Sequence, residues 1–226
     1  MMTIDEKKTR FGLIRHAETV WNREKRIQGQ LDSRLTAAGR RQAESWGHLL
    51  ETCHWDRCIC SDIARARATA AIVNQFVDVP ITCEAGLREQ NWGRWSGRSI
   101  AQIKAEVPDL LTRLTMRGWQ FRPPGGEDRD NVWERGQRVL KAAANKWPGA
   151  TILVVTHEGL IKCLVYRLLQ RRFLPTEPRI LRPAHLHWLV CSRGQIEIEK
   201  INAMALNGSD SSACATVNFN NKINLL

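Results

Sequence analysis

The sequence predicts an α/β fold, a three-layer sandwich in which a largely parallel central sheet is covered by helices on both faces. Short apolar runs bounded by turn signals alternate with segments of helical periodicity, which is the pattern of successive β–α units. The run at 151–156 (TILVVT) is continuous and mostly β-branched, as in a strand buried on both faces. A chain of 226 residues with 43% hydrophobic content can bury one full core.

Five segments are predicted as strands: 10–14, 57–60, 151–156, 186–191 and 195–201. The first three are apolar runs between helical segments, as expected of parallel strands. The last two are close together and should form a hairpin about Arg193 and Gly194 that finishes the sheet.

Five segments are predicted as helices: 36–51, 61–76, 99–115, 130–146 and 159–169. Thr36 is a suitable N-cap for the first helix, and Ser61 or Asp62 for the second, because a short polar side chain can accept a hydrogen bond from the first turn.

One domain is predicted over residues 1–206. Residues 92–128 have aromatic side chains of their own and a Pro-Pro-Gly-Gly turn, so we expect them to form a small cap inserted over the edge of the sheet. From Asn207 the composition turns to Asn, Ser and small residues without periodicity, which predicts a flexible tail at 207–226.

The net charge and the hydropathy of the chain indicate which kinds of ligand and partner to expect. The formal net charge of +11 favours anionic ligands. The basic residues are scattered and form no dense run or zinc-finger pattern, so no nucleic-acid partner is predicted. No segment approaches the roughly 18 apolar residues of a membrane span, and the N-terminal residues lack the apolar stretch of a signal peptide. We therefore expect no association with a membrane.

The cysteine pattern bears on the setting of the chain. Seven cysteines at irregular spacing include no C-x-x-C pair, which predicts neither a disulfide framework nor a zinc site. Cys58 and Cys60 alternate along a predicted strand and should be buried thiols. A reducing, cytoplasmic setting follows as a prediction. No metal and no cofactor are predicted, and nothing in the sequence indicates the oligomeric state.

An apolar strand ends abruptly at Arg15 and His16 in the first of four polar motifs, LIRHAETVWN (13–22). The carboxyl ends of parallel strands are where α/β proteins bind ligands, so both side chains should emerge over the crevice. An Arg-His pair alone is more often a surface feature. Three further motifs follow in order: CSDIARARATA (60–70), LREQNWGRWSG (87–97) and VVTHEGLI (154–161).

Together the four motifs resemble the histidine phosphatase superfamily, also called the phosphoglycerate mutase-like family. The resemblance extends over about residues 10–200 and includes Trp21-Asn22 and the spacing of Gly29, Asp32, Leu35, Thr36 and Gly39. It implies a phosphoglycerate mutase-like sandwich. Three positions depart from the family pattern: Ala17 and Glu158 stand where glycine is usual, and Ser96 where glutamate is usual.

The resemblance implies a metal-independent, histidine acid-type phosphatase that acts on a small phosphorylated metabolite through a phosphohistidine. His16 is the expected nucleophile, and Glu89, in a partly closed pocket, is the expected proton donor to the leaving alcohol. Arg15, Arg65 and a protonated His157 should neutralise the phosphoryl oxygens. The expected substrate-binding residues are Arg15, Asn22, Gln28, Gly29, Arg65 and His157.

Two alternatives to a phosphatase stay open. A mutase returns the phosphoryl group to another hydroxyl. Mutases of the family carry a long insertion between the acid and the second histidine, whereas Glu89 and His157 are 68 positions apart here (157 − 89), as in the shorter phosphatase branch. A non-catalytic module that binds a phosphorylated ligand is the other alternative. The filling of all five reacting positions argues against it.

The residues that would select a substrate are expected in the cap, because it lies between the acid and the second histidine. The candidates are Trp92, Trp95 and Trp119 and the arginines Arg94, Arg98, Arg113, Arg117 and Arg122.

Overall fold

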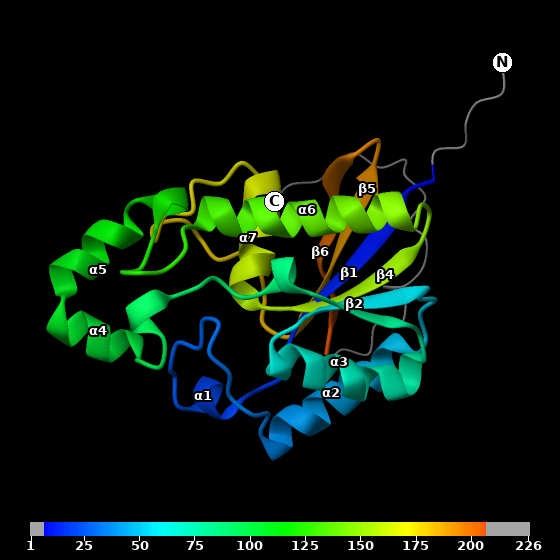
Figure 1. Ribbon diagram of the computed structural model, residues 1–226, viewed down its shortest axis with the longest axis horizontal. Coiled ribbons are helices and arrows are strands. Elements are labelled where there is room, and N and C mark those ends of the chain that lie inside the picture. Colours follow the sequence, from blue (N-terminus) through cyan, green and yellow to red (C-terminus); the bar gives the residue numbers. More distant parts are fainter. Residues whose placement is uncertain (1–6, 207–226) are drawn as a thin grey trace.

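The computed structural model describes residues 7–206, which form a six-stranded sheet in the order β3-β2-β4-β1-β5-β6. Helices α6 and α7 cover one face of the sheet, and α2 and α3 cover the other (Figure 1). The predicted three-layer α/β sandwich is confirmed. The predicted tail at 207–226 lies outside the described residues.

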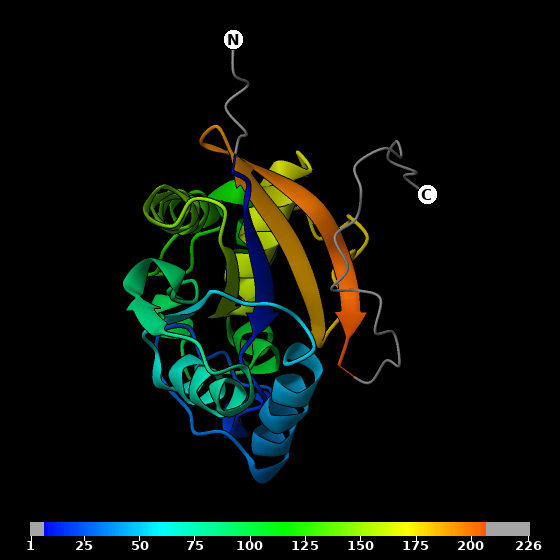
Figure 2. The same ribbon diagram turned by 90° about the vertical axis from the view of Figure 1, so that its right-hand side faces the viewer.

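Four parallel strands form the larger part of the sheet: β1 (Thr9–Arg15), β2 (Arg57–Ser61), β3 (Ile81–Glu84) and β4 (Thr151–Thr156). β5 (His185–Ser192) runs antiparallel to β1, and β6 (Gln195–Ala205) runs antiparallel to β5 at the edge (Figure 2). The hairpin turns at Arg193 and Gly194 as predicted. The five predicted strands are confirmed, and β6 extends beyond its predicted end.

The central strands are apolar on both faces because each face packs on its own layer of helices. Along β4, Ile152 and Val154 belong to the core cluster that includes α6 and α7, whereas Leu153 and Val155 belong to the cluster that includes α2 and α3. Side chains alternate across a strand, so one continuous apolar run supplies both layers. This buried strand fixes the position of His157, which directly follows it.

The helices are α1 (Val20–Arg23), α2 (Ala37–Leu50), α3 (Ala64–Val77), α4 (Ile100–Glu106), α5 (Pro108–Thr115), α6 (Arg129–Lys146) and α7 (Glu158–Leu168), with 3-10 turns at η1 (Ala85–Leu87), η2 (Gly93–Trp95) and η3 (Gly118–Gln120). Thr36 caps α2 as predicted, since its side chain accepts a hydrogen bond from the backbone N–H of Gly39. Neither Ser61 nor Asp62 caps α3. Ser61 is still part of β2, and the N-cap residue is Ile63.

Two further predictions about elements need correction. The single helix predicted over 99–115 is two helices, because Pro108 lacks an N–H group and forces Val107 out of the helical conformation. The strand β3 was not predicted at all. It has only four residues at the edge of the sheet, and they alternate between exposed and partly buried, so they form no apolar run.

α4 and α5 form a lobe to the left of the sheet in Figure 1, near the carboxyl ends of the parallel strands. The lobe has a small core of its own, made of Trp95, Ile103, Leu114 and Phe121. These residues fall within the segment 92–128 that was expected to form a cap.

The cysteines differ in state. Cys58 and Cys60 are free, buried thiols, as predicted. Cys53 is disulfide-bonded, which the irregular cysteine spacing does not predict. Among residues 7–206, no helix combines the length and the apolar character that crossing a membrane requires.

Candidate active site

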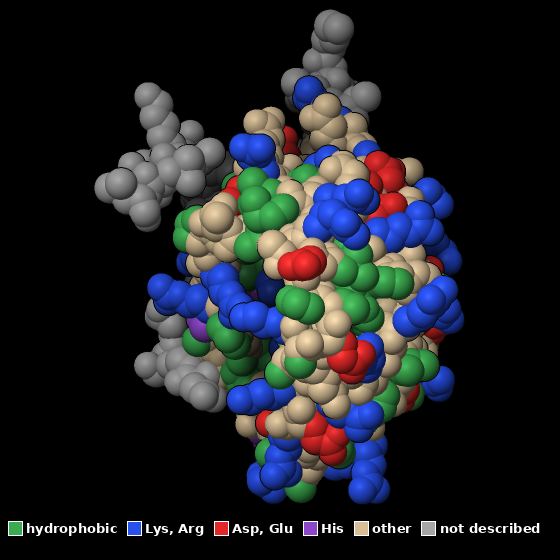
Figure 3. All heavy atoms as spheres, turned by 90° about the vertical axis from the view of Figure 1, so that its left-hand side faces the viewer, with side chains coloured by type: hydrophobic (Ala, Val, Ile, Leu, Met, Phe, Trp, Pro, Cys, Tyr) green, Lys and Arg blue, Asp and Glu red, His purple; other side chains and the backbone are tan. Residues whose placement is uncertain are grey.

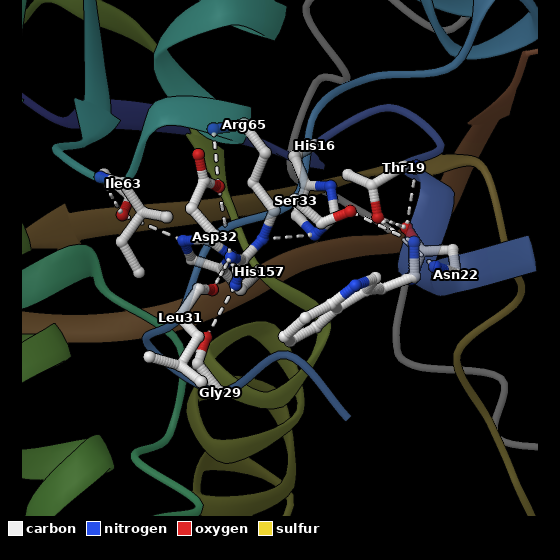
Figure 4. Close-up of polar contacts among 12 residues, drawn as sticks. His16, Thr19, Asn22, Gly29, Leu31, Asp32, Ser33, Ile63, Arg65 and His157 are labelled. Atoms are coloured by element: carbon white, nitrogen blue, oxygen red, sulfur yellow. Dashed lines mark hydrogen bonds and ion pairs between the residues drawn. The ribbon is translucent and has the colours of Figure 1, made fainter. Parts of the chain in front are cut away.

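The strand order brings the predicted reacting residues together. β1 and β4 are adjacent, so His16 and His157, which follow them, lie side by side with ring centroids 5.2 Å apart. β2 is the other neighbour of β4, and Arg65 in the first turn of the following helix points back between the two histidines (Figure 4). Adjacent parallel strands therefore place three residues from distant motifs in one cluster.

His16 presents one defined lone pair. Its Nδ1 lies 2.8 Å from the carbonyl oxygen of Ala17, which can only accept, so we assign the ring proton to Nδ1. Its Nε2 accepts a hydrogen bond from Nε of Arg65 at 3.2 Å. Burial, together with the charges of Arg15 and Arg65, holds the pKa of His16 well below its ordinary value. The imidazole is therefore neutral, and Nε2 is the nitrogen that can act as a nucleophile.

Arg65 organises the inner end of the site. Only 1% of this residue is exposed. Beyond its bond to His16, its guanidinium donates to the carbonyl oxygens of Gly29 and Leu31, both at 2.7 Å, and to Nδ1 of His157 at 3.2 Å. Its backbone N–H, in the first turn of α3, donates to a carboxylate oxygen of Asp32 at 3.2 Å. The rigid, planar donor set of arginine suits this bridging position.

His157 differs from the prediction in its protonation. A guanidinium N–H can only donate, so Nδ1 of His157 accepts from Arg65 and the ring proton is on Nε2, which donates to Oγ of Ser61 at 2.8 Å. Burial is the main cause that lowers the pKa of His157 well below its ordinary value, and His16 and Arg65 add to it. The prediction that His157 is protonated is therefore wrong for this structure. Burial and the neighbouring positive charges disfavour a second proton on the ring.

Glu89 is held by backbone groups on both sides. Its Oε1 accepts from the N–H of Gln90 at 2.8 Å, and its Oε2 accepts from the N–H of Gly159 at 3.1 Å. A Cβ at position 159 would lie 2.1 Å from Oε1, so this approach requires glycine there. Arg135 on α6 donates to the carbonyl oxygen of Glu89 at 3.0 Å and fixes the loop. The carboxylate is thereby placed in the wall of the same pocket as His16.

The predicted binding residues of the first loop also line this pocket. Oδ1 of Asn22 accepts from the backbone and hydroxyl of Thr19, both at 3.0 Å, which orients the amide. Oε1 of Gln28 is buried and has no hydrogen-bond partner among the described residues. Gly29 has a φ of +53°, a left-handed conformation that favours glycine and turns its carbonyl oxygen toward Arg65.

Arg15 is tied to the one acidic residue that departs from the family pattern at the site. Its NH1 donates to a carboxylate oxygen of Glu158 at 2.8 Å, and the other oxygen of Glu158 accepts from Nζ of Lys162. Burial opposes ionisation, but the two cations hold the pKa of Glu158 below its ordinary value. Glu158 is therefore an ionised carboxylate beside a residue expected to bind phosphate.

All of the predicted catalytic and binding residues except His157 line a pocket of about 440 Å³, and His157 is fully buried and absent from its wall. The face shown in Figure 3 has a hollow bordered by Lys and Arg side chains. The sequence did not single out several residues of the pocket wall: Arg26, Ile27, Ile100, Arg129, Lys162, Phe173 and Arg179. No motif marks them, because most of them come from loops and helix ends that only the tertiary fold brings to the pocket.

Only one of the residues predicted to select the substrate lines the pocket. Trp92 lines the pocket, whereas Trp95 and Trp119 are buried in core clusters and are absent from its wall. None of the five cap arginines named from the sequence lines the pocket either.

Residues 11–204 match the family described as the histidine phosphatase superfamily (branch 1). The chain belongs to this superfamily. One relative, "Probable phosphoglycerate mutase GpmB" of Citrobacter koseri, is 36% identical over 157 residues, which cover 70% of this chain and 73% of that protein. The family inferred from the four motifs is confirmed.

Solved structures share the fold over almost their full length. YhfR of Bacillus stearothermophilus superposes with a TM-score of 0.80 at 27% identity, covering 88% of this chain and 98% of that chain. A mycobacterial glucosyl-3-phosphoglycerate phosphatase, solved with VO3, superposes with a TM-score of 0.73 at 25% identity, covering 85% of this chain and 99% of that chain. The phosphatase prediction agrees with these relatives better than the binding-module alternative.

Proposed function

We propose that this chain hydrolyses phosphate monoesters of small metabolites through a phosphohistidine on Nε2 of His16, without a metal. The observation that carries the proposal is the state of the His16 ring. It is neutral, its proton is held by the carbonyl oxygen of Ala17, and its unprotonated nitrogen accepts a hydrogen bond from a buried guanidinium at 3.2 Å. This is a nucleophile paired with a cation that can stabilise the charge of a phosphoryl group.

In the first step the Nε2 lone pair attacks phosphorus, the P–N bond forms, and the P–O bond to the alcohol breaks. The N–H groups of Arg65 and Arg15 and the amide of Asn22 would bind the phosphoryl oxygens. Since His157 is neutral, it adds no charge, and its Nδ1 accepts a hydrogen bond that helps to hold the guanidinium of Arg65 in place. The positive charge thus comes from the two arginines.

Glu89 would give its proton to the departing alkoxide and then take one from the water that attacks the phosphohistidine. The second step breaks the P–N bond, releases inorganic phosphate and restores neutral His16. One carboxyl can serve both roles because Glu89 lines the same pocket as His16, on a loop that Arg135 holds in place.

Two measurements test the proposal. Purified protein should release phosphate from p-nitrophenyl phosphate at the same rate with and without a chelator. Tight binding without turnover would favour the non-catalytic module, and transfer of phosphate to an added alcohol in place of water would favour a mutase. The named mutase relatives make this last control necessary.

His16→Ala should abolish turnover, by at least about 10³-fold, because no other group is placed to accept the phosphoryl. Labelling with a radioactive phosphoester, quenched in base, should give a base-stable, acid-labile adduct on the original protein and none on the variant. Labelling that survives in His16→Ala would exclude His16 as the nucleophile.

A further inference from the structure

A second, smaller cavity of about 100 Å³ adjoins the catalytic pocket. The two share a wall made of Arg15, Glu158, Lys162 and Arg179. The far wall of this side cavity comes from the segment that leads into β5 and includes Arg182 and His187. None of the four sequence motifs reaches these last two residues, and the proposed reaction uses neither.

His187 supplies a buried hydrogen-bond donor to the side cavity. The residue is 3% exposed, on β5 next to β1. Its Nδ1 accepts from the backbone N–H of Asn202 at 3.1 Å, and burial, together with the charge of His185, lowers the pKa of His187 to about 4. The ring is therefore neutral with its proton on Nε2. Among residues 7–206, Nε2 has no hydrogen-bond partner, so its N–H remains available to a ligand in the cavity that His187 lines.

The charges around the side cavity are unbalanced. Glu158 compensates Arg15 and Lys162 through its two ion pairs. Arg179 and Arg182 are exposed, and neither guanidinium forms a hydrogen bond or an ion pair within the described part of the chain. The cavity thus combines the N–H donor of His187 with two arginines that form no ion pair among the described residues. An acceptor group of negative charge satisfies both needs.

We propose that the side cavity binds a second anionic group, a carboxylate or a phosphate, of a substrate whose reacting phosphate occupies the catalytic pocket. The shared wall is what allows one molecule to reach both cavities. The proposal rests on the proposed function for the first anion, and it adds no chemical step. It names the substrate class as phosphate monoesters that carry an anionic group at the end remote from the ester.

The binding of matched ligands tests this selection without turnover. His16→Ala protein is titrated calorimetrically with ω-carboxyalkyl phosphates and with the ω-hydroxyalkyl phosphates of the same chain lengths. At one chain length the carboxylate should bind about tenfold more tightly than the alcohol, as expected of a charge-assisted hydrogen bond. Equal binding of both series at every length would overturn the proposal while leaving the proposed function in place. Failure of both series to bind would count against the proposed function.

Variants locate the preference. Added to His16→Ala, Arg182→Gln should reduce the carboxylate preference about three- to tenfold, and so should His187→Asn, whose amide oxygen can still accept from Asn202 but whose donor no longer reaches the cavity. Arg172→Gln is the matched control, because Arg172 is an exposed arginine of the same loop that lines neither cavity. If Arg182→Gln and His187→Asn both keep the carboxylate preference, as the control does, the second anion binds elsewhere and the proposal is overturned.

The ring signal of His187 distinguishes the source of the anion. In nitrogen-15 NMR of His16→Ala protein, which does not hydrolyse the ester, inorganic sulfate alone should leave Nε2–H of His187 unchanged, and the carboxyalkyl phosphate of the preferred length should shift it. A shift with sulfate alone, lost in Arg182→Gln, would mean that the cavity holds a free anion and would overturn the substrate assignment. No shift with either ligand would also overturn the proposal.

Discussion

The inner end and the outer wall of the catalytic pocket are built in different ways. At the inner end, Arg65 and His157 are 1% and 0% exposed, and both nitrogens of each histidine ring have a hydrogen-bond partner. At the outer wall, Arg179 is exposed and forms no ion pair within residues 7–206. Fixed, dry donors favour electrostatic preorganisation for one reaction. The long, solvated side chains of the outer wall can be substituted without disturbing this preorganisation. The groups that carry out the reaction and those that could select the substrate therefore lie in different parts of the pocket.

Among the variants that test the difference between the inner end and the outer wall, the variant at Glu89 should have the largest effect on rate. Glu89→Gln should slow phosphorylation by alkyl phosphates about 100-fold or more, because an alkoxide needs a proton to leave. With p-nitrophenyl phosphate the loss should stay within about threefold, since p-nitrophenolate leaves without one. Single-turnover burst measurements on both substrates provide the check. Equal losses on the two would remove Glu89 from the acid role.

The buried histidines should make stability depend on pH. Burial lowers the pKa of His16, His157 and His187 in the folded state, the last to about 4. Below about pH 6.5 the unfolded chain binds protons at these positions and the folded chain does not. The free energy of unfolding is therefore undiminished above about pH 6.5 and should fall as the pH is lowered, by up to about 1.4 kcal/mol per pH unit for each histidine.

Urea unfolding between about pH 6.5 and 5 measures this slope. His187→Asn should reduce it, because one buried imidazole is removed. A slope that is the same in His187→Asn as in the original protein would mean that His187 is not held neutral by the fold.

The contrast between the two regions also explains what the sequence could predict. The inner end comes from residues within four positions of the ends of β1, β2 and β4, and each of these strands is an apolar run that ends in a polar motif. A strand and the residue after it are local features, so His16, Arg65 and His157 could be placed together from the sequence once the sheet was known to be parallel. The protonation of His157 could not, because it depends on donors from Arg65 and Ser61 and on complete burial.

The residues of the outer wall could be identified only from the tertiary structure. Phe173 and Arg179 lie between α7 and β5 in a segment without periodicity, and Arg129 opens α6 with its guanidinium over the rings of Phe121 and Phe173. Such contacts join parts of the chain that no local pattern connects. The same reason accounts for β3, whose pairing with β2 depends on a neighbouring strand and not on its own composition.

A smaller effect is expected at Glu158, where the two regions meet. Its ionised carboxylate lies against Arg15 and repels a phosphate dianion. Glu158→Gln should therefore lower KM for p-nitrophenyl phosphate about two- to fivefold with little change in kcat, as expected of a partly exposed charge screened by solvent. Glu44→Gln, an exposed substitution on α2, is the matched control. A rise in KM would mean that Glu158 orients Arg15 for the phosphate, which contradicts the repulsion argued here.

The cap arginines should have the smallest effect. Arg98 forms an ion pair with Glu106, and Nε of Arg122 donates to the carbonyl oxygen of Gly126 at 2.9 Å. Arg94 and Arg117 are exposed and lie outside the pocket wall. These arginines therefore interact with the lobe or with solvent, and none of them lines the pocket.

Alanine substitution of each of these four arginines should accordingly leave the ranking of phosphorylated substrates unchanged, with kcat/KM within about twofold of the original on each, because a surface charge at this distance is largely screened. Trp92→Ala is the comparison, since Trp92 is the tryptophan of the cap segment that lines the pocket. Loss of its ring should change the ranking by weakening substrates with an apolar or planar body. The measurement is kcat/KM across a panel of sugar phosphates, phosphoglycerates and nucleotides. A reordered panel for any arginine variant, with Trp92→Ala unaltered, would return substrate selection to the charged face of the lobe.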